Sequence, residues 1–288
     1  MIRILLCLAL AAGSFFAWPT ATRAAESYDN CTGFIDSLPA TISTQGTWCL
    51  DKNLSTSMTS GNAIEIATNN VTIDCNNFKI GGLTAGTGTG TTGIHALSRL
   101  NATVRHCNIR GFYYGIYIFG SGGHLVEDNS LDGNTHHGVL VAGNGSTIRN
   151  NLVIDTGGST KTTGSAYGIY ARHGVDIINN TVNGVAPEGE NANASGIFTN
   201  ANGEGSVSGN RVRGLAAIGA GDPTGIYILG SGRGVTRDND VQGPGPGVAG
   251  GVGILCDGNA ATARNNMVGG FATGVMGCLS SSNIVNPN

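Results

Sequence analysis

Aromatic and imidazole side chains stand directly before a recurring glycine at three places in the chain. These residues are Tyr113-Tyr114, His136-His137 and, after an alanine, Tyr167. Histidine is the side chain whose charge changes closest to neutral pH, and a neighbouring phenol can hold or release a proton. The pattern therefore predicts a proton-transfer site with His136 or His137 as the base and Tyr114 or Tyr167 as its partner. The alternative is that these groups are surface hydrogen-bonding residues at turns.

A base that takes a proton from a carbon beside a carboxylate needs a cation to neutralise that carboxylate. Arg172 and Lys161 are the candidates for this role, and we assign it to Arg172. A hydrolase would instead need two carboxylates about 5–9.5 Å apart. The available aspartates are scattered by strand alternation: Asp128, Asp132, Asp155, Asp238 and Asp240. The short run from Asp238 to Asp240 is not a calcium loop, and we assign no metal ligands.

A second set of residues predicts a binding surface. Each follows the first inward-facing residue of a predicted strand and should point outward: His95, Tyr117, Leu140, Tyr170, Phe198, Tyr227 and Leu255. Exposed contiguous apolar surface usually marks binding, and aromatic faces suit the C–H faces of sugar rings. We therefore assign substrate binding to His95, Tyr117, Tyr170, Phe198 and Tyr227. The alternative is that the stacked aromatics only stabilise neighbouring strands or lie under loops.

The elements that position these residues belong to a two-part repeat. The Gly-Ile or Gly-Val half recurs at Gly93, Gly115, Gly138, Gly168, Gly196, Gly225, Gly253 and Gly274, at spacings of 21 to 30 residues. The Asn-x-Val half recurs at Asn129, Asn151, Asn180, Asn210, Asn239 and Asn266, with Cys107 in the equivalent place one unit earlier. Self-similarity at this period indicates a solenoid.

Alternation within each unit indicates strands. If Ile116 points inward, then Tyr117 points outward and Ile118 inward. Short strands separated by turns, each pairing with its counterpart one unit away, predict an all-β parallel β-helix of about eight to nine coils. We expect the recurring glycine to adopt a positive φ, and the asparagines to bend the chain and stack their amides.

The variation in repeat length also has a pattern. The long inserts 83–92, 155–167, 184–195, 214–224 and 243–252 all lie between an Asn-x-Val half and the next Gly-Ile half. They should therefore emerge from one edge of the solenoid. Inserts on one face often build a binding face, although surface loops also drift neutrally.

The composition and the cysteines indicate where in or outside the cell the protein is found. A net charge of −3 argues against a nucleic-acid partner. Residues 1–24 read as a secretory signal peptide, and no other segment is long and apolar enough to span a bilayer. We predict a secreted or periplasmic protein with a non-repetitive N-terminal cap at 25–60 and repeats at 61–288. Of the six remaining cysteines we pair Cys31 with Cys49. Cys75–Cys107 and Cys256–Cys278 remain open as pairs.

A family resemblance follows from these motifs. The run from Asn70 to Asn77, the repeated Gly-Ile-Tyr-Ile and Asn-x-Val-x-Gly units, and the run from Leu38 to Leu50 resemble the right-handed parallel β-helix proteins of the pectate-lyase-like superfamily. The resemblance implies a right-handed coil. Lyases of this superfamily abstract a proton beside a uronic acid carboxylate and expel the glycosidic oxygen. The calcium-binding aspartate cluster of pectate lyases and the Asp-Pro-His-Asp motif of alginate epimerases are not evident here.

Two functions follow as hypotheses. The first is a secreted protein that binds polysaccharide, with lyase or C5-epimerase activity on an acidic polysaccharide, no organic cofactor, and calcium left open. The second is a non-catalytic carbohydrate-binding or surface-interaction protein. The oligomeric state is not predicted. Catalysis requires His137, Tyr114, Tyr167 and Arg172 to meet in one groove beside the outward aromatic column.

Overall fold

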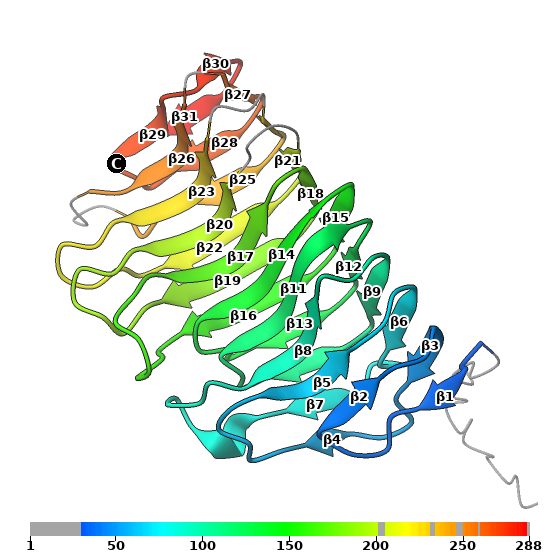
Figure 1. Ribbon diagram of the computed structural model, residues 1–288. Coiled ribbons are helices and arrows are strands. Elements are labelled where there is room, and N and C mark those ends of the chain that lie inside the picture. Colours follow the sequence, from blue (N-terminus) through cyan, green and yellow to red (C-terminus); the bar gives the residue numbers. More distant parts are fainter. Residues whose placement is uncertain (1–29, 201–204, 231–233, 246–249, 259, 287–288) are drawn as a thin grey trace, which may run out of the picture.

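The computed structural model describes residues 30–200, 205–230, 234–245, 250–258 and 260–286. The predicted signal peptide lies outside these residues. The described chain coils into a right-handed parallel β-helix, as predicted, and each coil contributes one strand to each of three parallel sheets (Figure 1). Within a coil the chain runs from sheet 2 to sheet 1 to sheet 3 and then back to sheet 2.

Each sheet stacks strands from successive coils. Sheet 1 contains β1 (Gly33–Phe34), β3 (Gly46–Cys49), β6 (Val71–Asp74), β9 (Ala102–Arg105), β12 (Leu125–Glu127), β15 (Ser146–Arg149), β18 (Val175–Ile178), β21 (Ser206–Ser208), β24 (Val235–Arg237), β27 (Thr262–Arg264) and β30 (Leu279–Ser281). Sheet 2 contains β2 (Ala40–Ile42), β5 (Asn62–Ile66), β8 (Thr92–Leu97), β11 (Tyr114–Gly122), β14 (His137–Asn144), β17 (Ala166–Arg172), β20 (Ala194–Asn200), β23 (Pro223–Leu229), β26 (Val252–Asp257) and β29 (Thr273–Met276). Sheet 3 contains β4 (Leu54–Ser55), β7 (Lys79–Gly81), β10 (Asn108–Arg110), β13 (Ser130–Asp132), β16 (Leu152–Gly157), β19 (Thr181–Ala186), β22 (Arg211–Leu215), β25 (Asp240–Gln242), β28 (Met267–Gly269) and β31 (Ile284–Asn286). One 3-10 helix, η1 (Leu83–Ala85), lies between β7 and β8.

The core is a column of aliphatic side chains contributed by every coil. Ile116 and Ile118 of β11 are fully buried and Tyr117 between them faces outward, which confirms the predicted alternation. Leu131 and Val153 close the core from sheet 3. Burial of each of these β-branched or leucine side chains stabilises the fold by roughly 1.5–3 kcal/mol relative to leaving it exposed.

The recurring glycine does not adopt a positive φ, so that expectation is wrong. A Cβ on Gly196 would point into the core and overlap Val212 of the following Asn-x-Val half, and it would lie 2.8 Å from the carbonyl oxygen of Gly225. The same contacts recur at Gly168 and Gly225. The two halves of the repeat therefore occur together because the valine fills the space that the glycine leaves.

The asparagine column forms the expected ladder between sheets 1 and 3. Each Nδ2 donates to the Oδ1 of the asparagine one coil further on, at 2.8–3.0 Å, from Asn129 through to Asn283. Cys107 takes the predicted equivalent place, since its backbone N–H donates to Asn129. The left-handed bend itself falls on the residue before each asparagine, such as Asp128 or Asn150, and not on the asparagine.

The first coil lies within the segment that we predicted as a cap. Strands β2, β3 and β4 pair with β5, β6 and β7, so sheet 2 contains ten described strands where eight to nine coils were expected. This coil lacks the Gly-Ile and Asn-x-Val signals, which is why the sequence did not reveal it. We propose that β1 and the loop closed by Cys31–Cys49 cap this end. The open pairs Cys75–Cys107 and Cys256–Cys278 are also disulfides.

The long connections emerge from one edge, as expected. Residues 82–91, 158–165, 187–193 and 216–222 all join a strand of sheet 3 to the next strand of sheet 2, and they project from the same side of the coil stack (Figure 1). The insert 243–252 has the same connectivity, although 246–249 lie outside the described residues.

Candidate functional site

Three outward columns of side chains run along sheet 2. The first precedes each recurring glycine and contains Thr92, Tyr114, His137, Tyr167, Ser195 and Thr224. The central column contains Glu65, His95, Tyr117, Leu140, Tyr170, Phe198, Tyr227 and Leu255. The third contains Leu97, Phe119, Ala142, Arg172, Asn200 and Leu229. The first two columns share a face because the glycine and the isoleucine that separate them both point inward.

The first column brings the predicted proton-transfer residues together. The His137 ring lies 5.0 Å from that of Tyr114 and 4.9 Å from that of Tyr167. His136, in the turn before β14, lies 4.2 Å from His137 and stacks on Tyr113 at 4.6 Å. Sequence reasoning thus identified a true cluster.

The cluster is largely buried and uncharged. His137 is only 4% exposed, and its Nδ1 has no hydrogen-bond partner among the described residues. Burial, followed by the neighbouring His136, holds the pKa of His137 well below its usual range, and burial lowers the pKa of His136 to about 4. Burial raises the pKa of Tyr114 to about 12 and also raises the pKa of Tyr167. At neutral pH all four groups are therefore neutral.

Two long loops meet beside this cluster. The backbone N–H of Thr160 donates to the carbonyl of Thr87 at 3.1 Å, which joins connection 158–165 to connection 82–91. The coils between them have short turns, which carry Tyr113 and His136. Lys161 Nζ lies 5.6 Å from the centroid of the Tyr113 ring. The rings of Tyr114, Tyr167 and Tyr170 lie within 5.4 Å of the His137 ring, so a polymer on the open face of sheet 2 meets these rings before it reaches His137.

Arg172 lies apart from the cluster. It is five residues beyond Tyr167 on β17, a span of about 16 Å along an extended strand. Its guanidinium lies 5.7 Å from the ring of Phe119 in the third column. The structure therefore brings together three of the four residues required for catalysis. Arg172 lies apart from them, at the C-terminal end of β17.

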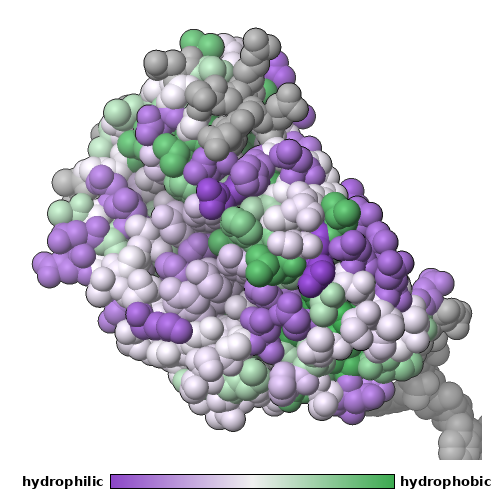
Figure 2. All heavy atoms as spheres, in the orientation of Figure 1, coloured by the Kyte–Doolittle hydropathy of each residue, from purple (hydrophilic) through white to green (hydrophobic). Residues whose placement is uncertain are grey.

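The central column forms a stacked aromatic strip. Tyr170 stacks on Phe198 at 4.8 Å, and Tyr227 meets Phe198 edge to face at 5.1 Å. Leu140 and Phe198 are only 7% exposed, whereas Tyr117, Tyr170 and Tyr227 are half-buried. Hydrophobic patches lie among hydrophilic atoms over the middle coils in Figure 2. The rings stabilise one another, as the alternative interpretation holds, and the three tyrosines still present surface to solvent.

One pair of residues was missed by sequence reasoning. Glu65 of β5 precedes His95 in the central column, and its Oε2 lies 2.6 Å from His95 Nδ1. The Asn62 side-chain amide donates to the same oxygen at 2.7 Å. Strand β5 has no Gly-Ile motif, so Glu65 was not aligned with the column. Matching Ile64 to Ile94 would have found it.

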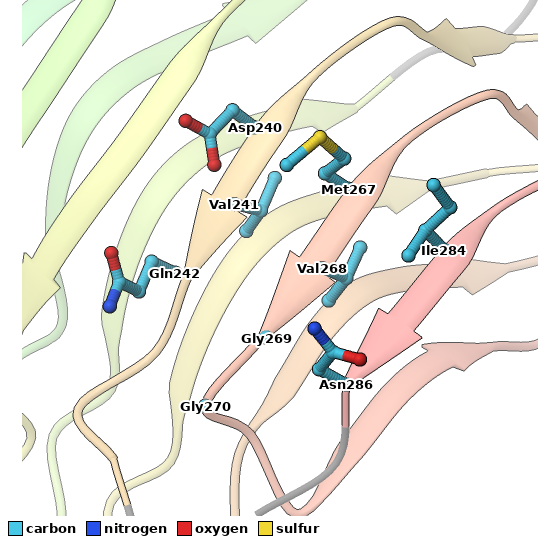
Figure 3. Close-up of a pocket in the computed structure, with 9 residues that line it drawn as sticks. All are labelled: Asp240, Val241, Gln242, Met267, Val268, Gly269, Gly270, Ile284 and Asn286. Atoms are coloured by element: carbon cyan, nitrogen blue, oxygen red, sulfur yellow. The ribbon is translucent and has the colours of Figure 1, made fainter.

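Two hollows lie on sheet 3. One, of about 310 Å³, is lined by side chains from β25, β28 and β31, including Asp240, Met267 and Ile284 (Figure 3). A second, of about 290 Å³, lies beside Lys79, Arg110 and other residues of β7, β10 and β13. Across the described residues, no group of three or more His, Cys, Asp or Glu side chains is placed to hold a metal ion.

Comparisons with known proteins agree with this architecture. Residues 42–196 match the family model described as the right handed beta helix region. No curated protein matches the chain. Among solved structures the chain is similar to the Dettilon tailspike protein (gp208), with a TM-score of 0.55 and 14% identity, over 88% of this chain and 60% of that one. The Agl-KA catalytic domain matches at a TM-score of 0.38 and 13% identity, over 86% of this chain and 58% of that one.

At 14% identity the likeness to the tailspike shows the fold alone. The chain spans 60% of the length of the tailspike that it matches. No helix within the described residues is long and apolar enough to cross a membrane.

Proposed function

Since this chain belongs to the family of proteins with a right-handed β-helix region, we propose that it binds polysaccharide along the outer face of sheet 2. The observation that supports this proposal is the central column, in which Tyr117, Tyr170 and Tyr227 remain partly open to solvent. Phe198 lies between Tyr170 and Tyr227 and contacts both rings, and Leu140 separates them from Tyr117. A sugar ring presents C–H groups to an aromatic face and hydroxyls to water, so a rigid aromatic strip suits a chain of sugars.

An acidic polysaccharide suits this face better than a neutral one. Lys161 on the loop side and Arg172 on the other side flank the aromatic columns. Neither residue forms an ion pair within the described chain, although other arginines such as Arg105 and Arg149 do. Cations that no protein carboxylate neutralises are available to the carboxylates of a ligand.

Substitution of the tyrosines tests the binding proposal. We expect Tyr170→Ala and Tyr227→Ala each to weaken binding to polyuronates by roughly fivefold, equivalent to about 1 kcal/mol for each lost ring contact. Calorimetric titration of polygalacturonate, alginate and glycosaminoglycan oligomers into the protein measures this effect. Leu152→Ala, an exposed apolar residue on sheet 3, is the matched control. Equal affinities for the tyrosine variants and the wild-type protein would contradict the proposal.

Elimination or C5-epimerisation of an acidic polysaccharide is the second candidate function. The convergence of His136, His137, Tyr114 and Tyr167 supports it as the acid–base cluster, with Arg172 as a more distant carboxylate ligand. The double variant His136→Ala/His137→Ala should then lose the ultraviolet absorbance of unsaturated sugar ends while it retains binding. If the wild-type protein binds without any change to the polymer, the alternative of a non-catalytic binding protein is favoured.

The proposed setting is secreted or periplasmic. Three disulfides join cysteines within the described chain, and such bonds persist in oxidising compartments. The apolar N-terminal segment supports the same location as a signal peptide. Polysaccharides outside the cytoplasm are the partners that this location offers.

A further inference from the structure

A hydrogen-bonded carboxylate and imidazole lie at the N-terminal end of the central column. His95 Nδ1 is 2.6 Å from Glu65 Oε2, and the two side chains are 18% and 27% exposed. Asn62 fixes the carboxylate through a second hydrogen bond to Oε2. The Tyr117 ring lies on the other side, stacked on the imidazole at 5.2 Å with an interplanar angle of 18°. The imidazole is therefore held on two sides and is open to solvent on the outer face.

The contact with Glu65 determines which nitrogen carries the proton. An ionised carboxylate only accepts hydrogen bonds, so Nδ1 of His95 must be the donor. In a neutral imidazole the lone pair is then on Nε2. No described residue forms a hydrogen bond with Nε2. The arrangement is that of a base whose ring is oriented by a carboxylate behind it.

A second carboxylate–histidine pair in the chain also uses Nδ1 of the imidazole, but it differs in the other partner of its carboxylate and in its place on the solenoid. Asp74 Oδ1 lies 3.1 Å from His106 Nδ1, but Asp74 Oδ2 also accepts from Arg105 at 2.7 Å. The arginine neutralises that carboxylate, and His106 lies beyond the end of β9 in sheet 1, away from the aromatic columns. Glu65 has no cation within the described chain, so its charge acts on His95. The Asp74–His106 pair is structural and provides a matched control.

A cation for the substrate lies on the loop side of the pair. Lys161 Nζ is so close to Gly90 that a Cβ there would overlap it, and Gly90 is two residues before β8, the strand of His95. The same ammonium approaches Tyr113. Since Gly90 is five residues before His95, Lys161 is placed to bind the carboxylate of another uronic acid of the same polymer, and not that of the ring from which His95 takes the proton.

We propose that Glu65 and His95 form a proton-transfer site for polyuronates, in which His95 is the catalytic base and Glu65 positions it. His95 Nε2 takes the proton from the carbon beside the uronic carboxylate, and the electrons of that C–H bond form a double bond to the next carbon. The bond from that carbon to the glycosidic oxygen breaks, and the oxygen leaves with a proton from water or from the Tyr117 hydroxyl. This inference rests on the proposed binding function. It assigns proton transfer to His95 on the open face of sheet 2, in place of the buried His136 and His137.

The experiment separates binding from proton transfer. The protein is incubated with polygalacturonate or alginate in heavy water, and NMR follows both unsaturated ends and deuterium at the carbon beside the carboxylate. We expect one of these products with the wild-type protein. His95→Gln should lower its rate by about 10²- to 10⁴-fold without loss of binding. Glu65→Gln should lower kcat by about tenfold or more with KM and thermal unfolding unchanged, as expected for a residue that acts through His95.

The controls identify each kind of failure. His106→Gln removes the other carboxylate–imidazole pair and should leave the rate unchanged. If the wild-type protein binds polyuronate but yields neither product, or if His95→Gln reacts at the wild-type rate, this inference is overturned and the binding function stands. If no polyuronate binds at all, the proposed function itself fails.

Discussion

Gly196→Ala is expected to destabilise the protein by about 3 kcal/mol or more, at the upper end of the range for overpacked cores. The added methyl would overlap Val212 and would lie 2.8 Å from the carbonyl oxygen of Gly225 on the next coil. The carbonyl belongs to a sheet that cannot shift without breaking its ladder, so the strain has no easy release. Thermal and denaturant unfolding of the variant measure the loss.

Two further variants make this prediction specific. Gly88→Ala is the control, because its Cβ would meet only Thr160 Oγ1 at 3.4 Å in an exposed loop, and we expect a change within about 0.5 kcal/mol. Val212→Ala removes one of the two clashes, so the double variant Gly196→Ala/Val212→Ala should be less destabilised than the sum of the single variants. If Gly196→Ala behaves like Gly88→Ala, the glycine–valine account of the repeat is wrong.

The second large effect is a loss of stability in mild acid. Burial depresses the folded-state pKa values of His136 and His137, to about 4 for His136, whereas both residues titrate near 6.5 when unfolded. The unfolded state therefore binds more protons below pH 6.5. The contribution of these histidines to stability is complete above that pH and is lost as the pH falls toward 4. Each fully depressed histidine removes up to about 1.4 kcal/mol per pH unit in this window.

His137→Leu isolates the contribution of the buried member of the pair. This variant has no imidazole to protonate, so the slope of unfolding free energy between pH 6.5 and 4.5 should decrease by about one proton. His124, whose pKa burial also lowers, continues to contribute to the slope in both proteins. His173→Asn, at an exposed position with a positive φ that asparagine tolerates, is the control. An unchanged slope in His137→Leu would show that His137 is not buried as a neutral group.

Much of the fold follows from local patterns in the sequence. The alternation around Tyr117 places the aromatic column correctly, and the spacing of the asparagines predicts their ladder, because both depend on residues a fixed distance apart. The reason for the recurring glycine could not be predicted, since the valine that excludes a side chain comes from a different sheet. Turn chemistry was the nearest local explanation for Gly196, and tertiary packing overrides it.

The site was predictable only in part for the same reason. Tyr114, His137 and Tyr167 meet because they occupy one register position, which the repeat reveals. The loops beside them meet because Thr160 reaches Thr87 across intervening coils, and no local pattern encodes such a contact. The separation of Arg172 from Tyr167 was predictable from the sequence, because five residues of an extended strand cover about 16 Å along the strand direction.

Hydroxyl-radical footprinting with and without a bound polyuronate tests the central claim most directly, because it reports which side chains the polymer covers. We expect protection of Tyr117, Tyr170 and Tyr227 on sheet 2. Met267, which is 56% exposed and lines the hollow on sheet 3, oxidises readily and should remain unprotected. Protection of Met267 with no change at the three tyrosines would place the ligand on sheet 3 and would contradict the account.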